Sequence, residues 1–187
     1  AGHAARGVEA VLHPGTRQVA AGYVLYGSST VFVLTTGNGV DMFVLDQSIG
    51  SYVLVESKLR IPDSEKVYSV NEAYAPRFPE AYRDYLSWAQ GERYSSRYIG
   101  SMVADVHRTL LRGGVFLYPQ TEDHSDGKLR LLYEANPMSM IIEEAGGLAT
   151  TGTQRILDIK PESLHQRTPV ILGSPEEVAN VERFTQP

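Results

Sequence analysis

Side chains that could bind a phosphate group recur in this sequence where strands and helices are expected to begin or end. Arginine offers a fork of donors to phosphate oxygens, lysine offers a mobile point charge, and tyrosine or asparagine offers a neutral donor that orients the group. The candidates of these types are Asn71, Tyr74, Arg97, Tyr98, Tyr118, Lys128 and Arg130. Each is a weak signal alone, because a tyrosine at a strand end is more often a half-buried packing residue.

A helix start and a carboxylate add further candidates. Gly100, Ser101 and Met102 open an expected helix, whose free backbone N–H groups suit an anion or a sugar hydroxyl. Glu134 comes just before another expected helix start, where a carboxylate either complements the helix dipole or binds a cation. Composition alone favours the dipole role for Glu134.

Other titratable residues are expected to be structural. The acidic turn 122–127 ends in glycine and is typical of a solvated loop, so it is assigned no metal ligand. His3, His13, His107 and His165 form no Ser-His-Asp or His-x-x-x-His arrangement, and a lone histidine is more often hydrogen-bonded than catalytic. The sequence contains no Walker loop, dinucleotide-binding glycine motif or nucleophile elbow.

Length and composition limit the class of protein. With 187 residues and no cysteine, the chain suffices for one globular domain and must use oxygen or nitrogen ligands for any metal. The net charge of -5 argues against nucleic acid as a partner. No run approaches the roughly 18 apolar residues of a membrane-spanning helix, and no signal-peptide pattern is seen. We therefore expect a soluble, unexported protein with no membrane partner.

Turn residues divide the first part of the chain into short strands. We expect strands at 19–26, 30–36, 40–46 and 51–55, joined by turns rich in glycine and serine, and therefore a sequential antiparallel meander. Both faces of several of these strands are apolar. We therefore expect helices to cover this sheet on both sides.

Helices and strands alternate in the second part of the chain. Helices are expected at 79–90, at 102–112 with Ser101 as its N-cap, after Asn136 as N-cap, and at about 175–184. Strands are expected at 115–118 and 169–172. This order predicts an α/β fold, in which a layered, mixed β-sheet is flanked by helices.

Long blocks of this sequence resemble, in order and spacing, the C-terminal domain of class I fructose-1,6-bisphosphatases. The blocks include QVAAGY at 18–23, YGSST at 26–30, YSVNE at 68–72, SRYIGSMVADVHR at 96–108, GKLRLLYEANPM at 127–138, EAGG at 144–147 and ILGS at 171–174. Blocks of this length are far more specific than a short motif. The resemblance implies a sugar-phosphatase C-terminal domain over residues 19–187, with residues 1–18 as a linker or trimmed segment.

The resemblance implies a role for each candidate. Residues that match the family's 6-phosphate ligands are Asn71, Tyr74, Tyr98, Tyr118 and Lys128, and Arg97 matches one that reaches this phosphate from a neighbouring subunit. Gly100, Ser101 and Met102 match contacts to the sugar, and Arg130 lies near the 1-phosphate and metal. Glu134 matches a carboxylate ligand of the catalytic cation, normally Mg²⁺ with Mn²⁺ as the alternative. This role replaces the dipole role that composition favours.

The implied activity is metal-dependent hydrolysis of the 1-phosphate of fructose 1,6-bisphosphate to fructose 6-phosphate, in gluconeogenesis or sugar synthesis. The family's Asp-Pro-x-Asp-Gly-Ser metal motif and its upstream glutamates are absent from these 187 residues. We therefore expect the missing N-terminal half to be a partner, and this chain alone to be inactive. The resemblance further implies a homotetramer in the full-length form, in the cytoplasm or alternatively a plastid. Ala73 departs from the family pattern, which commonly has glycine there.

Several alternatives remain open. Sedoheptulose-1,7-bisphosphatase activity is one, because a pocket that reads one phosphate and a few hydroxyls tolerates a longer sugar. A non-catalytic fragment that binds sugar phosphate is another, and it predicts binding of fructose 6-phosphate without metal-dependent phosphate release. A stable fragment that neither binds nor catalyses would expose apolar surface. A dimer is the alternative to the tetramer.

Overall fold

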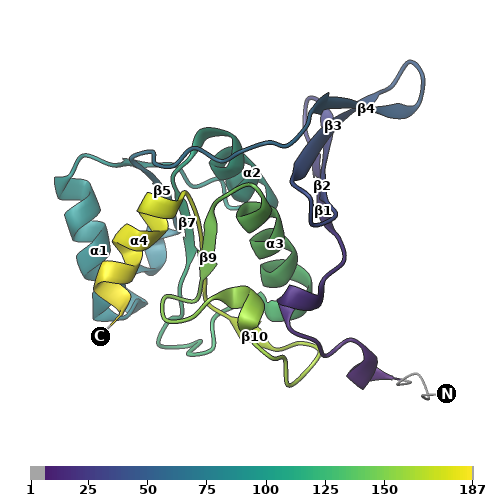
Figure 1. Ribbon diagram of the computed structural model, residues 1–187. Helices are drawn as coiled ribbons and strands as arrows, with labels where there is room; N and C mark the ends of the chain where they lie inside the picture. The colour runs from purple at the N-terminus through teal and green to yellow at the C-terminus, as the bar shows by residue number, and fades with distance from the viewer. Residues whose placement is uncertain (1–6, 187) are drawn as a thin grey trace.

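The computed structural model describes residues 7–186 (Figure 1). Most of the strands form two β-sheets. The first sheet joins neighbours along the chain, all antiparallel: β1 (Ala21–Tyr26), β2 (Thr30–Thr35), β3 (Val40–Asp46) and β4 (Ser51–Glu56). Short turns let each strand return beside the last, so that Tyr26 pairs with Thr30 across the first turn. The predicted meander is confirmed.

The second sheet is mixed, with the order β6-β5-β7-β11-β9. Its strands are β5 (Val67–Ser69), β6 (Ser95–Ser96), β7 (Val115–Tyr118), β9 (Leu148–Thr150) and β11 (Val170–Gly173). β5 runs parallel to β6 and β7, whereas β11 runs antiparallel to β7 and β9. A separate ladder pairs β8 (Leu129–Arg130) with β10 (Arg167–Thr168). The predicted α/β class with a mixed sheet is confirmed.

Helices form layers on both faces of the second sheet. They are α1 (Glu80–Gly91), α2 (Met102–Arg112), α3 (Asn136–Glu144) and α4 (Pro175–Thr185). α1 and α4 lie on one face, while α2 and α3 lie on the other, between the two sheets (Figure 1). Side chains of β7 point alternately to the two faces of the sheet. Val115 and Leu117 pack in the core with α1 and α4, whereas Phe116 packs in the core with α2 and α3. Between residues 7 and 186, no helix has the length and apolar character needed to cross a membrane.

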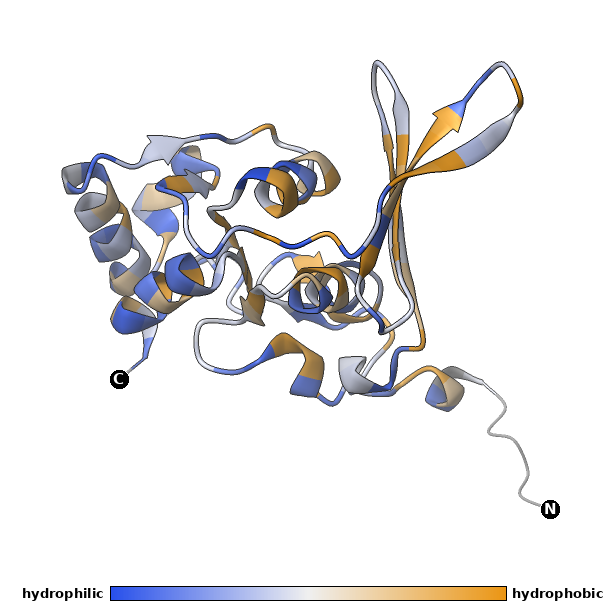
Figure 2. Ribbon diagram, turned by 45° about the horizontal axis from the view of Figure 1, so that its top comes forward, coloured by the Kyte–Doolittle hydropathy of each residue, from blue (hydrophilic) through white to orange (hydrophobic). Residues whose placement is uncertain are grey.

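The first sheet is less covered than expected. α2 and α3 pack against β1, but β4 pairs only along β3 and all of its residues are exposed. Tyr52, Val53, Leu54 and Val55 keep 42%, 44%, 51% and 52% of their surface in solvent, and Figure 2 shows apolar segments along these projecting strands. The prediction of helical cover on both sides is wrong within residues 7–186, because the helices reach the β1 side and the meander extends past them.

The start of α3 also differs from the prediction. A π-helical turn, η4 (Leu131–Ala135), runs directly into α3, and Asn136 has helical backbone angles of -60° and -50°. An N-cap needs a non-helical backbone, so Asn136 is not the cap. Ser101 does occupy the N-cap position of α2, although its side chain makes no capping hydrogen bond.

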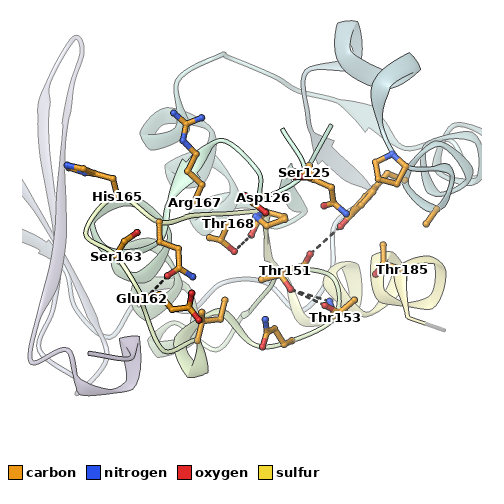
Figure 3. Close-up of a pocket in the computed structure, with 18 residues that line it drawn as sticks. Ser125, Asp126, Thr151, Thr153, Glu162, Ser163, His165, Arg167, Thr168 and Thr185 are labelled. Atoms are coloured by element: carbon orange, nitrogen blue, oxygen red, sulfur yellow. Dashed lines mark hydrogen bonds between the residues drawn. The ribbon is translucent and has the colours of Figure 1, made fainter. Parts of the chain in front are cut away.

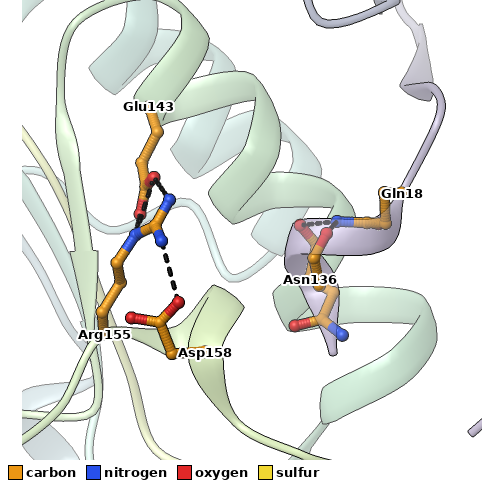
Figure 4. Close-up of polar contacts among 6 residues, drawn as sticks. Gln18, Asn136, Glu143, Arg155 and Asp158 are labelled. Carbon is orange, nitrogen blue, oxygen red and sulfur yellow. Dashed lines mark hydrogen bonds and ion pairs between the residues drawn. The ribbon is translucent and has the colours of Figure 1, made fainter. Parts of the chain in front are cut away.

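Short turns and polar contacts hold the segments beside α3 (Figure 4). The 3₁₀ turns are η1 (Val8–Ala10), η2 (Gly15–Arg17), η3 (Glu72–Arg77) and η5 (Ile156–Asp158), and of these η2 and η5 pack against α3. Gln18 Nε2 donates to the carbonyl of Asn136 at 3.1 Å, which ties η2 to α3. Arg155 binds Glu143 of α3 at 2.6 Å and Asp158 of η5 at 2.9 Å. The division of the chain into 1–18 and 19–187 stays a prediction.

Candidate functional site

The parallel strands β6, β5 and β7 end at one edge of the second sheet, and the candidate residues follow these ends. Arg97 and Tyr98 come after β6, Asn71 comes after β5, and Tyr118 is the last residue of β7. Parallel strands present their carboxyl ends on the same side, which is where open α/β sheets bind ligands. The sheet thus gathers side chains that are distant in sequence.

A pocket of about 10 Å³ at this edge, which has room for one water molecule, is lined by four of the predicted 6-phosphate ligands. Its polar lining includes Asn71, Tyr74, Tyr118 and Lys128, and its other lining residues are Val70, Phe78, Leu117, Pro119 and Thr121. The Nζ atom of Lys128 lies 4.5 Å from the centre of the Tyr74 ring. Within residues 7–186 no carboxylate forms an ion pair with Lys128, so its charge is available to an anion.

Local hydrogen bonds fix Asn71 and Tyr74 at the start of η3. Asn71 is the N-cap of this turn, and its Oδ1 accepts from the backbone N–H of Ala73 at 3.1 Å. The carbonyl of Asn71 accepts from the N–H of Tyr74 at 3.0 Å. The amide NH₂ of Asn71 is therefore the group suited to donate to a ligand. Ala73 has no positive φ, so the structure does not require glycine there.

Tyr98 and Tyr118 are neutral donors. Burial raises the pKa of Tyr118, and the neighbouring Tyr74 and Glu134 add to this effect. Burial is also the main cause that raises the pKa of Tyr98, followed by Tyr118, Asp105 and Tyr74. A raised pKa keeps the phenol protonated at neutral pH, so both hydroxyls can donate to an anion.

The loop that leads into α2 is held by Asp105, a residue that none of the sequence patterns selects. Asp105 is fully buried, and its carboxylate accepts from the backbone N–H of Ile99 at 2.8 Å, from that of Gly100 at 3.1 Å, and from Ser69 Oγ at 2.6 Å. Gly100 has a φ of 87°, a left-handed conformation that favours glycine. An acidic residue on the buried face of an amphipathic helix is the signal that could have revealed Asp105.

The predicted sugar contacts lie on this same loop. Gly100 and Ser101 are exposed, while Met102 is partly buried against the core. The ring of Tyr98 is near Gly100, since a Cβ on that glycine would lie 3.8 Å from it. The loop therefore brings the predicted sugar contacts beside a predicted phosphate ligand.

Two predicted 6-phosphate ligands do not line the pocket: one is Tyr98, and the other is Arg97. Its side chain is exposed, and its guanidinium donates to the carbonyl of Ser96 at 2.9 Å. It does not line the pocket described above. The implied role of Arg97 in a neighbouring subunit stays a prediction.

Glu134 lies in the π-helical turn η4 and folds back onto Arg130. Its Oε2 accepts from the backbone N–H of Arg130 at 2.6 Å. Turns of this kind are frequent at functional sites. Between residues 7 and 186, however, no three His, Cys, Asp or Glu side chains gather in a way that could hold a metal ion. Glu134 supplies one carboxylate, so the described residues alone do not fit a complete Mg²⁺ site.

Several of the remaining titratable residues have hydrogen-bond or ion-pair partners within residues 7–186. The histidine pairs are His107 with Tyr23 at 2.8 Å, His165 with Tyr133 at 2.9 Å, and His13 with Arg17 at 3.3 Å. Asp123 of the acidic turn pairs with Arg77 at 2.8 Å. His3 lies outside the described residues.

A larger cavity of about 840 Å³ shares the 118–128 segment as a wall (Figure 3). Hydroxyl and amide side chains from three loops dominate its lining, and none of the predicted ligands is among them. Asp126 and Glu162 accompany Arg167, which among residues 7–186 is the one lysine or arginine in the lining. This balance suits a phosphate poorly, so we assign the candidate site to the smaller pocket beside Lys128.

The fold and the pocket define an α/β protein whose candidate anion-binding site lies at the carboxyl ends of parallel strands. Comparison with known proteins gives the family. A family model described as fructose-1-6-bisphosphatase, C-terminal domain, matches residues 61–186, and one described as fructose-1-6-bisphosphatase, N-terminal domain, matches residues 2–57. The chain belongs to the fructose-1,6-bisphosphatase family.

Individual relatives agree with this assignment. The chain is 56% identical over 172 residues to fructose-1,6-bisphosphatase isozyme 2 of Mus musculus, covering 89% of this chain and 51% of the relative. It is 52% identical over 185 residues to a class 1 fructose-1,6-bisphosphatase of Salinibacter ruber, covering 96% and 52%. The crystal structure of Leishmania major fructose-1,6-bisphosphatase in holo form superposes with a TM-score of 0.92 at 47% identity, covering 95% of this chain and 55% of that one. The chain thus spans about half the length of the relatives it matches.

Proposed function

We propose that this chain forms the sugar-phosphate-binding part of a fructose-1,6-bisphosphatase, which hydrolyses the 1-phosphate of fructose 1,6-bisphosphate to fructose 6-phosphate. The observation that carries the proposal is the convergence of Asn71, Tyr74, Tyr118 and Lys128 on one pocket at parallel strand ends. A lysine charge surrounded by neutral donors suits one phosphate group.

On this proposal the pocket anchors the 6-phosphate, which is remote from the bond that breaks. Lys128 neutralises the phosphate, and the amide of Asn71 and the tyrosine hydroxyls orient it. Binding of a remote group places the reacting end, which converts binding energy into correct orientation. After burial and Tyr74, Glu134 also raises the pKa of Tyr118, which supports a reacting end close to the anchor.

Arg130 and Glu134 are the residues we propose for the reacting end. Mg²⁺, or alternatively Mn²⁺, would supply charge neutralisation there when bound. Glu134 would be one ligand, and further ligands must come from outside the described residues, because residues 7–186 hold no cluster of metal-binding groups. We therefore propose that the chain alone binds sugar phosphate and does not release phosphate.

An oligomer is part of the proposal. Arg97 is exposed and lies outside the pocket of its own chain, which suits a residue that completes the phosphate site of a neighbouring subunit. A homotetramer, a cytoplasmic location and a role in gluconeogenesis or sugar synthesis rest on the family resemblance alone.

Calorimetry with fructose 6-phosphate tests the binding part. We expect saturable binding that weakens at least about tenfold in Lys128→Ala, because a hydrogen bond to a charged group contributes roughly 1.5–3 kcal/mol. Lys66→Ala is the matched control, since Lys66 is an exposed lysine that pairs with Glu92 at 3.3 Å. Absence of binding by the unmodified chain, or equal losses in both variants, contradicts the proposal.

Phosphate release from fructose 1,6-bisphosphate in the presence of Mg²⁺ tests the catalytic part. We expect no release from this chain alone. Release that disappears in Glu134→Gln would mean that the chain completes its own metal site, and the binding-only proposal would then be wrong. Rates on fructose and sedoheptulose bisphosphates, compared in a protein of the relatives' length, decide between the two substrates.

A further inference from the structure

Two segments carry most of the proposed sugar-phosphate contacts, and they meet at one buried carboxylate. The first segment follows β5 and holds Asn71 and Tyr74, and the second follows β6 and holds Tyr98 and the 100–102 turn. Neither segment is held to the other by a strand ladder beyond the short pairing of β5 with β6. Their relative position therefore depends on the bond from the N–H of Arg97 to the carbonyl of Tyr68 at 2.9 Å and on side-chain contacts.

Asp105 makes these contacts with three donors. Ser69 Oγ, at the end of β5, donates to Oδ1 at 2.6 Å. The backbone N–H of Ile99 donates to the same oxygen at 2.8 Å, and that of Gly100 donates to Oδ2 at 3.1 Å. Asp105 and Ser69 are both 0% exposed, so water does not compete for these bonds.

The carboxylate itself is presented by a rigid element. Asp105 lies in α2 beside Val106, which is fully buried in the core between the two sheets. Its carbonyl accepts from Thr109 Oγ1 at 2.9 Å, and its N–H donates to the carbonyl of Ser101 at 2.8 Å. A group whose own position is fixed by packing can hold other groups precisely.

We propose that Asp105 is a positioning residue of the sugar-phosphate site, which fixes the 98–102 loop against the end of β5. The proposal rests on the proposed function and goes beyond it, because Asp105 is fully buried and does not line the pocket. A carboxylate suits the task because it accepts at both oxygens, whereas an asparagine amide would turn a donor toward one of the three donors. Within residues 7–186, no other side chain accepts a hydrogen bond from the backbone of residues 98–101.

Amide hydrogen exchange in the ligand-free protein tests the positioning directly. In Asp105→Asn we expect the amides of Ile99 and Gly100 to exchange at least about tenfold faster, since the acceptor loses its charge and turns an NH₂ group toward one of its donors. The amide of Gly113, which donates to Thr109 at the far end of α2, should keep its rate. Unchanged exchange at Ile99 and Gly100 would overturn the proposal.

Binding of fructose 6-phosphate tests whether this positioning serves the site. We expect affinity to fall about tenfold or more in Asp105→Asn, because small misplacements of binding groups are costly. Ser69→Ala removes only the β5 side of the contact and should weaken binding by about two- to fivefold. If Asp105→Asn does not fold, the affinity of Ser69→Ala for fructose 6-phosphate tests the proposal, and an unchanged affinity would contradict it.

Glu177→Gln is the matched control. Glu177 is also buried, at 1% exposure, and its carboxylate accepts from Ser64 Oγ at 2.6 Å and from the Tyr94 hydroxyl at 2.7 Å. Neither partner lines the pocket. This variant should lose thermal stability as the Asp105 variant does while keeping its affinity for fructose 6-phosphate. Equal losses of affinity in both would reduce Asp105 to a purely structural role.

The two measurements separate this inference from the proposed function. If the unmodified chain does not bind fructose 6-phosphate, the proposed function fails, while hydrogen exchange still decides whether Asp105 holds the loop. If the unmodified chain binds and Asp105→Asn binds equally well, the positioning role fails and the proposed function stands.

Discussion

The ammonium group of Lys128 lies 4.5 Å from the centre of the Tyr74 ring, and the guanidinium of Arg77 lies 4.6 Å from the same ring. Of these two cations, Arg77 is neutralised by Asp123 at 2.8 Å, whereas Lys128 has no such partner within residues 7–186. The Tyr74 ring thus holds the Lys128 charge in place in the lining of the pocket without cancelling it.

Replacement of this ring should weaken phosphate binding through Lys128. We expect Tyr74→Leu to reduce affinity for fructose 6-phosphate by roughly two- to fivefold beyond any loss in Tyr74→Phe, which keeps the ring and removes only the hydroxyl. Titration calorimetry on the two variants measures the difference. Equal affinities in the two variants would assign the effect to the hydroxyl and not to the ring.

Stability should decrease in mild acid because of His107. This histidine hydrogen-bonds Tyr23 at 2.8 Å, and burial lowers its pKa in the folded state. The unfolded chain then binds the proton more readily, so the free energy of unfolding falls as the pH drops through about 6.5, the ordinary histidine value.

Urea unfolding between about pH 7.5 and 5.5 checks this prediction. His107→Gln should flatten the dependence on pH, because it removes the group that titrates. His13→Gln changes an exposed histidine and should leave the dependence unchanged. A steeper loss of stability in His107→Gln would contradict the assigned direction of the pKa shift.

Gly114 should resist substitution because of its place between α2 and β7. Its φ is 99°, and a Cβ there would press against the carbonyl oxygen of Val67 in β5. We expect Gly114→Ala to lower the free energy of unfolding by at least about 2 kcal/mol, from backbone strain and displacement of β5.

Gly50→Ala separates the two causes. Gly50 also has a positive φ, of 64°, but nothing lies within 4 Å of its added Cβ. This variant should lose only about 1 kcal/mol, the cost of a left-handed backbone alone. Urea denaturation measures both losses, and similar values would show that contact with β5 is unimportant.

The exposed edge strand β4 should make this chain associate with itself. Tyr52, Val53, Leu54 and Val55 are all exposed on a strand whose outer edge is unpaired within the described residues, and such edges are templates for further pairing. Leu54→Lys should therefore lower the sedimentation-average mass at high concentration. Gln47→Lys adds the same charge in the neighbouring turn and should have less effect. A monomer at all concentrations would contradict the prediction.

Local structure could be predicted well because short-range rules decide it. The buried face of α1, with Tyr82, Tyr85, Leu86 and Ala89, follows helical spacing, and the helix begins one residue later than expected, after Pro79. The meander follows from its turn residues. The resemblance also selected Asn71, Tyr74, Tyr118 and Lys128, which the structure brings to one pocket.

Longer-range features could not be read from the sequence. Asn136 has the residue type of an N-cap, but the π-helical turn before it places it inside the helix. The apolar faces of β4 suggest cover, but which faces are covered depends on where α2 and α3 end relative to the sheet. Asp105 resembles an ordinary helical acid until Ser69 and the backbone of Ile99 and Gly100 fold around it.

The sequence by itself determined the helices, the meander, the α/β class and the residue types of the site, because periodicity and turn chemistry act over a few residues. Only the tertiary structure decided that the ends of β6, β5 and β7 lie together and that Lys128 reaches Tyr74. It also decided that one buried carboxylate holds the loop beside them. The physical reason is that strand order and the partners of buried polar groups depend on contacts between distant segments, and these form only when the whole domain packs.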